Sequence, residues 1–89
     1  MAYRVELAPS AARRFKRLSR SVQARLGARI DALAQDPRPH GMQQLSAPER
    51  FYCIREGDYC IIYQVQDEAQ LVLVLKVGHR REVYRRLLR

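Results

Sequence analysis

The chain has 89 residues, with 17 lysines and arginines against 9 acidic residues, so its formal net charge is +8 at pH 7. This length predicts one domain, residues 1–89, with a modest core. No apolar run is long enough for a membrane-spanning helix and the first residues do not resemble a secretory signal, so we expect a soluble cytoplasmic protein without a membrane partner. Only Lys16 and Lys76 are lysines, and arginine suits planar contacts to phosphate and stacking on bases. The composition favours nucleic acid or an acidic protein as partner, with an ordinary solvated basic surface as the alternative.

The first part of the sequence predicts a strand and then a helix. Apolar and charged residues alternate over residues 3–7, which is typical of a half-buried strand, and Pro9 ends it. Ser10 is the expected N-cap of the helix that follows. This helix carries a narrow apolar edge among arginines.

A second helix follows, opened by Ser19 or Ser21 and ended by the proline-rich stretch 36–39. Apolar side chains recur in it at helical spacing, at Val22, Leu26, Ile30 and Leu33. The two helices are therefore expected to form a helical hairpin, each with one buried stripe. Leu45 marks a candidate short strand in the connector beyond them.

Residues 51–63 predict a β-hairpin whose two-residue turn is Gly57-Asp58. This turn pairs Arg55 with Cys60, and alternation places one set of side chains toward the core: Tyr52, Ile54, Ile61, Tyr63 and Val65. Arg55 lies between two thiols on the opposite face. It is either a site residue or a solvated strand charge.

The two cysteines are expected to be diagonal neighbours in this hairpin. Diagonal pairs lie roughly 7–8 Å apart, beyond the usual Cα spacing of a disulfide, about 4.4–6.8 Å. We therefore expect no bridge between Cys53 and Cys60. Small semi-buried apolar groups and a thiolate stabilised by Arg55 are the two interpretations of these thiols. Their spacing matches no zinc site.

The last part of the sequence predicts a strand at 71–75, covered on both faces because it does not alternate, then a break at Gly78 and a terminal helix. The predicted fold is α+β, with the order β-α-α-β-β-β-α and a largely antiparallel sheet. Arg80 and Tyr84 share a face of the terminal helix, and together they can hold a phosphate and stack on a base. Tyr84 as a core aromatic is the alternative. His79 is either a general base or a helix cap.

The sequence IREGDY at 54–59, IIY at 61–63 and VGHRREVY at 77–84 resemble the RelE/ParE superfamily of bacterial toxins, closest to the RelE-type mRNA interferases. The likeness spans essentially the whole chain. It implies a compact ribonuclease-like fold with the helical hairpin packed on the sheet. It also implies an acidic antitoxin partner, DNA contact only through the antitoxin complex, no cofactor and, in RelE-type members, cleavage of mRNA on the ribosome.

Carried over by residue, the resemblance implies catalytic roles for Arg55, Arg80 and Tyr84. Arg55 matches the second basic position of the first hairpin strand, Arg80 the arginine after the last strand, and Tyr84 the tyrosine of the terminal helix. No metal is implied.

The same resemblance places Cys53 and Cys60 at active-site positions that are usually basic. Arg50 and Arg81 are the expected RNA-binding arginines that compensate for this loss. The resulting hypothesis is a ribosome-dependent endoribonuclease weakened by the replacements. The alternatives are a non-enzymatic ParE-like inhibitor of DNA gyrase and a degenerate toxin that retains only antitoxin binding.

Overall fold

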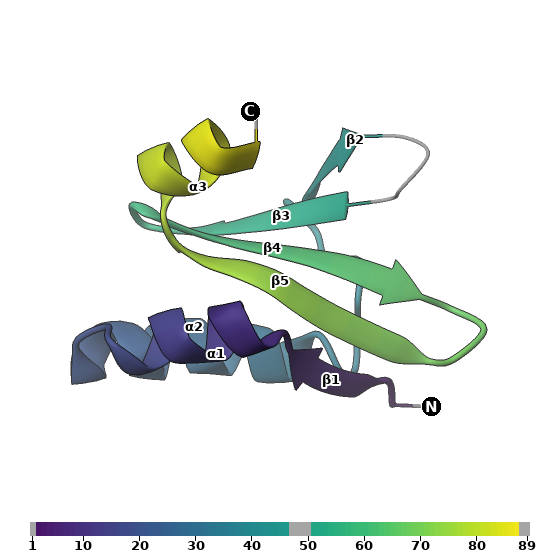
Figure 1. The fold of residues 1–89 in the computed structure, drawn as a ribbon. Helices are drawn as coiled ribbons and strands as arrows, with labels where there is room; N and C mark the ends of the chain where they lie inside the picture. The colour runs from purple at the N-terminus through teal and green to yellow at the C-terminus, as the bar shows by residue number, and fades with distance from the viewer. Residues whose placement is uncertain (1, 47–50, 88–89) are drawn as a thin grey trace.

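The computed structural model describes residues 2–46 and 51–87. The elements follow in the order β1 (Arg4–Leu7), α1 (Pro9–Lys16), α2 (Arg20–Ala32), β2 (Gln43–Ser46), β3 (Phe51–Glu56), β4 (Tyr59–Gln66), β5 (Leu71–His79) and α3 (Arg80–Leu87). The strands form one sheet in the order β1-β5-β4-β3-β2, with α1 and α2 on one face and α3 on the other (Figure 1). The predicted α+β class is confirmed. The predicted order lacks β2, but the candidate short strand at Leu45 is confirmed, because Leu45 lies in β2.

The sheet is antiparallel except for the pairing of β1 with β5. Because β1 is parallel to β5, the chain must cross the sheet between them, and α1, α2 and the β2–β3–β4 segment make that crossing. β1 pairs only with residues 71–74 of the longer β5. Past residue 74, α1 and α3 both lie close to β5. A small hollow of about 50 Å³ there is lined by Arg14 of α1, Lys76 of β5 and Val83 of α3.

The two N-terminal helices begin for different local reasons. α1 begins at Pro9, with Ala8 rather than the predicted Ser10 as N-cap, because proline has no N–H to leave unsatisfied and its φ is preset for a helix. Ser19 caps α2 as one of the two predicted serines, since its hydroxyl accepts a hydrogen bond from the Val22 N–H at 3.3 Å.

The main core lies between these helices and the sheet. All four apolar side chains of the predicted α2 stripe are buried, and so are the five predicted core-facing residues of the hairpin. The hairpin register is confirmed as well, and Gly57 has a φ of +61°, a conformation that glycine adopts without steric cost.

A second, smaller core lies on the opposite face, beneath α3. It consists of Cys53, Cys60, Ile62 and Val83, with Leu45 and Phe51 packed against it. Val83 is the α3 residue of this cluster, so it is the apolar anchor of α3 within the described part of the chain.

Two expectations for the C-terminal part are wrong. β5 continues through Gly78 to His79, because both residues pair with β4, and α3 begins only at Arg80. The second face of β5 is only half-covered, since Leu71 and Leu73 are partly exposed while Val72 and Val74 are buried. Within the described residues, no helix is both long and apolar enough to cross a membrane.

Candidate functional site

One row of the sheet joins the two segments that the sequence singled out. Arg55 of β3 pairs with Cys60 of β4, and Cys60 pairs in turn with Gly78 of β5. Directly paired residues share a face, and neighbouring strands lie about 4.7–4.9 Å apart, so Arg55 and Gly78 lie on the same face with roughly 9–10 Å between their backbones. α3 starts two residues later. Arg55 and the first turn of α3 therefore lie at the same end and on the same face of the sheet.

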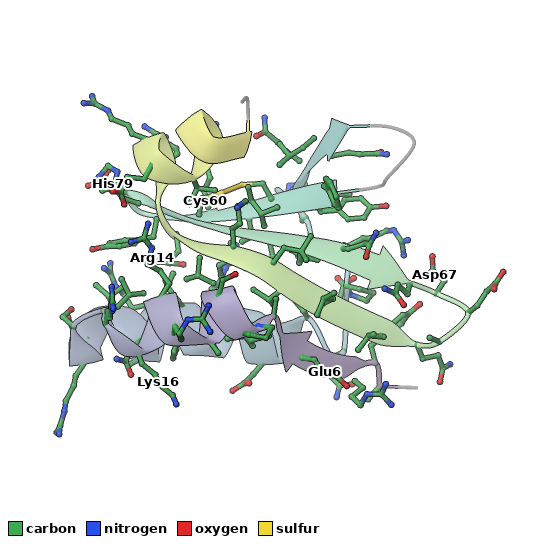
Figure 2. All side chains as sticks on the ribbon, viewed as in Figure 1. Glu6, Arg14, Lys16, Cys60, Asp67 and His79 are labelled. Atoms are coloured by element: carbon green, nitrogen blue, oxygen red, sulfur yellow. A yellow bond between two sulfur atoms is a disulfide. The ribbon has the colours of Figure 1, made fainter. Side chains whose placement is uncertain are left out.

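The hairpin turn holds the start of α3. The Arg80 N–H donates a hydrogen bond of 2.8 Å to the carbonyl oxygen of Asp58. His79 lies at the same end of the sheet, edge-on to Tyr59 with ring centroids 6.0 Å apart (Figure 2). Its Nδ1 accepts the Arg81 N–H at 3.4 Å, so His79 caps the helix, which is the second of its two predicted roles.

The guanidinium groups at this end carry uncompensated charge. Arg55 and Arg81 are exposed and Arg80 is half-buried. None of the three forms an ion pair with an acidic residue in the described part of the chain, whereas Arg29 and Arg38 are paired elsewhere. Free guanidinium groups on one surface are suited to bind phosphate, which accepts two parallel hydrogen bonds from each.

The cysteines are bonded to each other, so the expectation that no bridge forms is wrong. Cys53 and Cys60 form a disulfide with a Cα–Cα distance of 6.4 Å, inside the range for disulfides of about 4.4–6.8 Å. Because a hairpin has a right-handed twist, the two diagonal distances between neighbouring residue pairs are unequal. Cys53 and Cys60 are separated by the shorter of these distances. Both residues are almost fully buried, and Figure 2 shows the sulfur–sulfur bond beneath α3. Their burial agrees with the interpretation as small apolar groups.

Two predicted site residues fall where the structure does not describe them. Arg50 lies outside the described residues. Tyr84 belongs to the helical span of α3, but its side chain lies outside the described part. Among the described residues, no group of three histidine, cysteine or acidic side chains gathers in a way that would hold a metal ion.

Sequence reasoning missed a contact that links α3 to the opposite layer. Arg14 of α1 donates a hydrogen bond of 3.4 Å from Nη2 to Oε2 of Glu82, across a sequence separation of 68 residues. An added Cβ at Gly78 would lie 3.8 Å from Nε of Arg14, so the guanidinium passes beside the β5 edge. Nothing in the sequence pattern of α1 indicates this contact.

These observations define a class: a mostly antiparallel five-stranded sheet with two helices on one face and a short basic helix over the other is the fold of RelE toxins. The protein-family model for the ParE toxin of the type II toxin–antitoxin system parDE matches residues 5–84 of this chain. The chain therefore belongs to the RelE/ParE family of type II toxins.

Solved relatives agree with this assignment. The RelE–RelB complex of Pyrococcus horikoshii superposes with a TM-score of 0.80 at 26% identity, over 90% of this chain and 97% of that one. The isolated E. coli RelE toxin gives a TM-score of 0.79 at 27% identity, over 98% and 96%. Toxin RelG of Mycobacterium tuberculosis is 40% identical over 35 residues, which span 39% of this chain and 40% of that relative.

Proposed function

We propose that this toxin is an mRNA endoribonuclease that acts with the ribosome in the cytoplasm and so inhibits translation. The observation that supports this proposal is the register row of Arg55, Cys60 and Gly78, together with the anchoring of Arg80 to the hairpin turn. Arg55 and the backbone of Arg80 come from separate segments and lie at the same end of the sheet.

Cleavage of RNA by the neighbouring 2′-hydroxyl requires three things: a deprotonated nucleophile, a neutralised phosphate and a protonated leaving 5′-oxygen. Arginine stays charged and is a poor proton acceptor, so Arg55 and Arg80 would neutralise the scissile phosphate. Tyr84 would stack on a base or take part in proton transfer. In this mechanism the ribosome presents the message and the toxin mainly supplies charge and positioning.

The chain lacks two cations that the resemblance leads one to expect. Removing one electrostatic contact to the reacting group commonly lowers the rate by about 10²–10³-fold. With Cys53 and Cys60 buried beneath α3, Arg50 and Arg81 are the proposed RNA-binding replacements. We expect a weaker nuclease than one with a full set of cations.

The proposed inhibitor is an acidic antitoxin encoded with the toxin. The P. horikoshii relative is a complex with RelB, and another structure contains the intact RelB–RelE pair of E. coli. The net charge of +8 on this chain favours an acidic partner. DNA contact is proposed only through the antitoxin complex, where the antitoxin would bind the operator.

Primer extension on a translated message after induction of this protein alone tests the nuclease. Wild type is expected to give cuts in a fixed position relative to codons, and Arg55→Ala or Arg80→Ala is expected to reduce them by about 10²-fold or more. Arg4→Ala is the matched control, because Arg4 is paired with Glu6 on β1, far from the site. Undiminished cutting by Arg80→Ala would remove that residue from the mechanism, and no codon-positioned cuts with wild type would end the nuclease proposal.

The second candidate is a ParE-like inhibitor of DNA gyrase. The observation that favours it is the match to the ParE family model over residues 5–84. The two missing cations also fit this candidate, because an inhibitor that acts by binding does not need them for catalysis. A supercoiling assay with purified gyrase separates the two candidates, since a RelE-type nuclease leaves supercoiling unchanged. A degenerate toxin would neither inhibit gyrase nor slow growth on induction.

A further inference from the structure

The disulfide lies directly under the element that carries Arg80. Cys53 is 1% exposed and Cys60 is 0% exposed, and both belong to the small core that Val83 of α3 closes. Cys60 also occupies the row between Arg55 and Gly78. The two sulfurs therefore lie between the sheet and the helix, next to the candidate site.

α3 is held on the sheet by few contacts in the described part of the chain. Val83 supplies its apolar anchor, the Arg80 N–H bonds the hairpin turn, and Glu82 pairs with Arg14 at 3.4 Å. The ion pair is half-exposed, so it adds little. Within the described part of the chain, the packing of Val83 over the sulfurs is therefore the apolar contact that docks the helix.

Breaking the disulfide changes the space that the two sulfurs need. Bonded sulfurs are about 2.0 Å apart, whereas two unbonded heavy atoms approach no closer than roughly 3.5–4.0 Å. Protein cores contain few voids, so this extra separation has to displace a neighbour. Val83 is the described residue that links this cluster to α3, so a displacement of Val83 is passed on to the helix.

We propose that Cys53–Cys60 is a thiol–disulfide exchange site whose redox state sets how firmly α3 is docked. A dithiol reductant attacks one sulfur through its thiolate and forms a mixed disulfide, and its second thiol then releases the other protein sulfur. Two electrons pass to the protein, its sulfurs take up two protons as thiols, and the reductant leaves as a cyclic disulfide. Because both sulfurs are buried, the attack occurs only when α3 lifts.

The consequence for the site rests on the proposed function. Docking of α3 holds Arg80 at the end of the sheet where Arg55 lies, so the disulfide form keeps the two cations at one end and the dithiol form lets them separate. The cytoplasm keeps thiols reduced, which makes the loosened form the resting one. Oxidation then tightens the site and raises nuclease activity.

Amide hydrogen exchange on the full chain tests the docking directly. Protein oxidised in air and protein reduced with dithiothreitol are compared, and the mass after alkylation under denaturing conditions establishes the state of each sample. Amides of α3 are expected to exchange about tenfold faster in the reduced protein, while those of the β4–β5 core keep their protection. The matched control is the Cys53→Ala/Cys60→Ala variant, which should exchange identically with and without dithiothreitol.

Three results would overturn the proposal: equal α3 protection in both redox states, a dithiothreitol response that persists without the cysteines, or two alkylatable thiols in the oxidised sample. The wild-type comparison needs no variant to fold. Exchange is independent of cleavage, so a redox-dependent α3 without RNA cutting in either state would reject the nuclease and leave the exchange site intact. Equal cutting by both states would reject the link between the disulfide and the site.

Discussion

Replacing Arg38 by alanine should destabilise the protein without touching the candidate site. Arg38 lies in the loop after α2 and reaches the β4–β5 turn, where Nη1 and Nη2 donate to the two carboxylate oxygens of Asp67 at 3.1 and 2.8 Å. Its Nε donates to the Tyr52 hydroxyl at 3.3 Å, and the guanidinium lies 5.4 Å from the centroid of that ring. Both side chains are partly exposed, so solvent screens part of this ion pair.

The magnitude follows from these contacts. A partly exposed ion pair contributes about 0.5–1 kcal/mol, a hydrogen bond about 1 kcal/mol, and a cation over an aromatic ring at such a site about 0.5–1 kcal/mol. Because one guanidinium makes all of them, the contributions overlap, and we expect Arg38→Ala to cost about 2 kcal/mol. For a chain of this length that lowers the melting temperature by about 10 °C.

Thermal and urea unfolding of wild type, Arg38→Ala and Arg38→Lys measure this effect. The lysine variant keeps the charge but not the planar fork, so it should recover less than half of the loss. At temperatures where the variants are folded, RNA cleavage should equal that of wild type, which makes Arg38→Ala a stability control for the site variants. A loss below about 0.5 kcal/mol would refute this reasoning, since it would mean that solvent screens the whole set of contacts.

Three further predictions concern single residues. Burial raises the pKa of Tyr63 above its usual range, so the stability that its protonated hydroxyl contributes is complete below about pH 10 and falls as pH rises toward the raised pKa; unfolding free energies measured across this range should fall more steeply for wild type than for Tyr63→Phe. Ser19→Ala should cost about 0.5–1 kcal/mol in urea unfolding by removing the α2 cap, whereas Ser21→Ala should be near neutral. Gly57→Ala should destabilise the protein by about 1 kcal/mol because of the positive φ at this position. Gly27→Ala should instead stabilise it by about 0.5–1 kcal/mol, because Gly27 lies inside α2 and an added Cβ would be 3.7 Å from Cζ of Phe15, an ordinary contact distance.

Each of these has a contradicting result. Parallel pH profiles for wild type and Tyr63→Phe would show that this hydroxyl does not titrate differently in the folded and unfolded states. Equal losses for the two serine variants would mean that the cap bond adds nothing. A stabilising Gly57→Ala would contradict the assigned turn conformation.

Much of the hairpin could be predicted because its register is a local property. A two-residue turn at Gly57-Asp58 fixes which residues face each other, and alternation then assigns every side chain to one face. The same local logic placed the α2 stripe and located the basic segment after β5. It failed at Gly78, where the sequence indicates a break, because pairing with β4 continues the strand.

The disulfide and the contacts of α3 could not be predicted in this way. The separation of Cys53 and Cys60 depends on the twist of the hairpin, which an average diagonal spacing does not include. The pairing of Arg14 with Glu82 joins residues 68 positions apart, and that of Arg38 with Asp67 spans 29. No periodicity carries information over such separations.

The sequence by itself determined the order of most elements, the two faces of the hairpin and the charge that points to RNA or an acidic partner. These follow from periodicity, turn geometry and composition, which act between near neighbours in the chain. Only the tertiary structure decided that Arg55 and the start of α3 share one end of the sheet, and that the two cysteine sulfurs are bonded and buried beneath the helix, next to the site. Both features depend on strand twist and on the packing of segments that are distant in the sequence, because the whole fold determines which side chains come into contact.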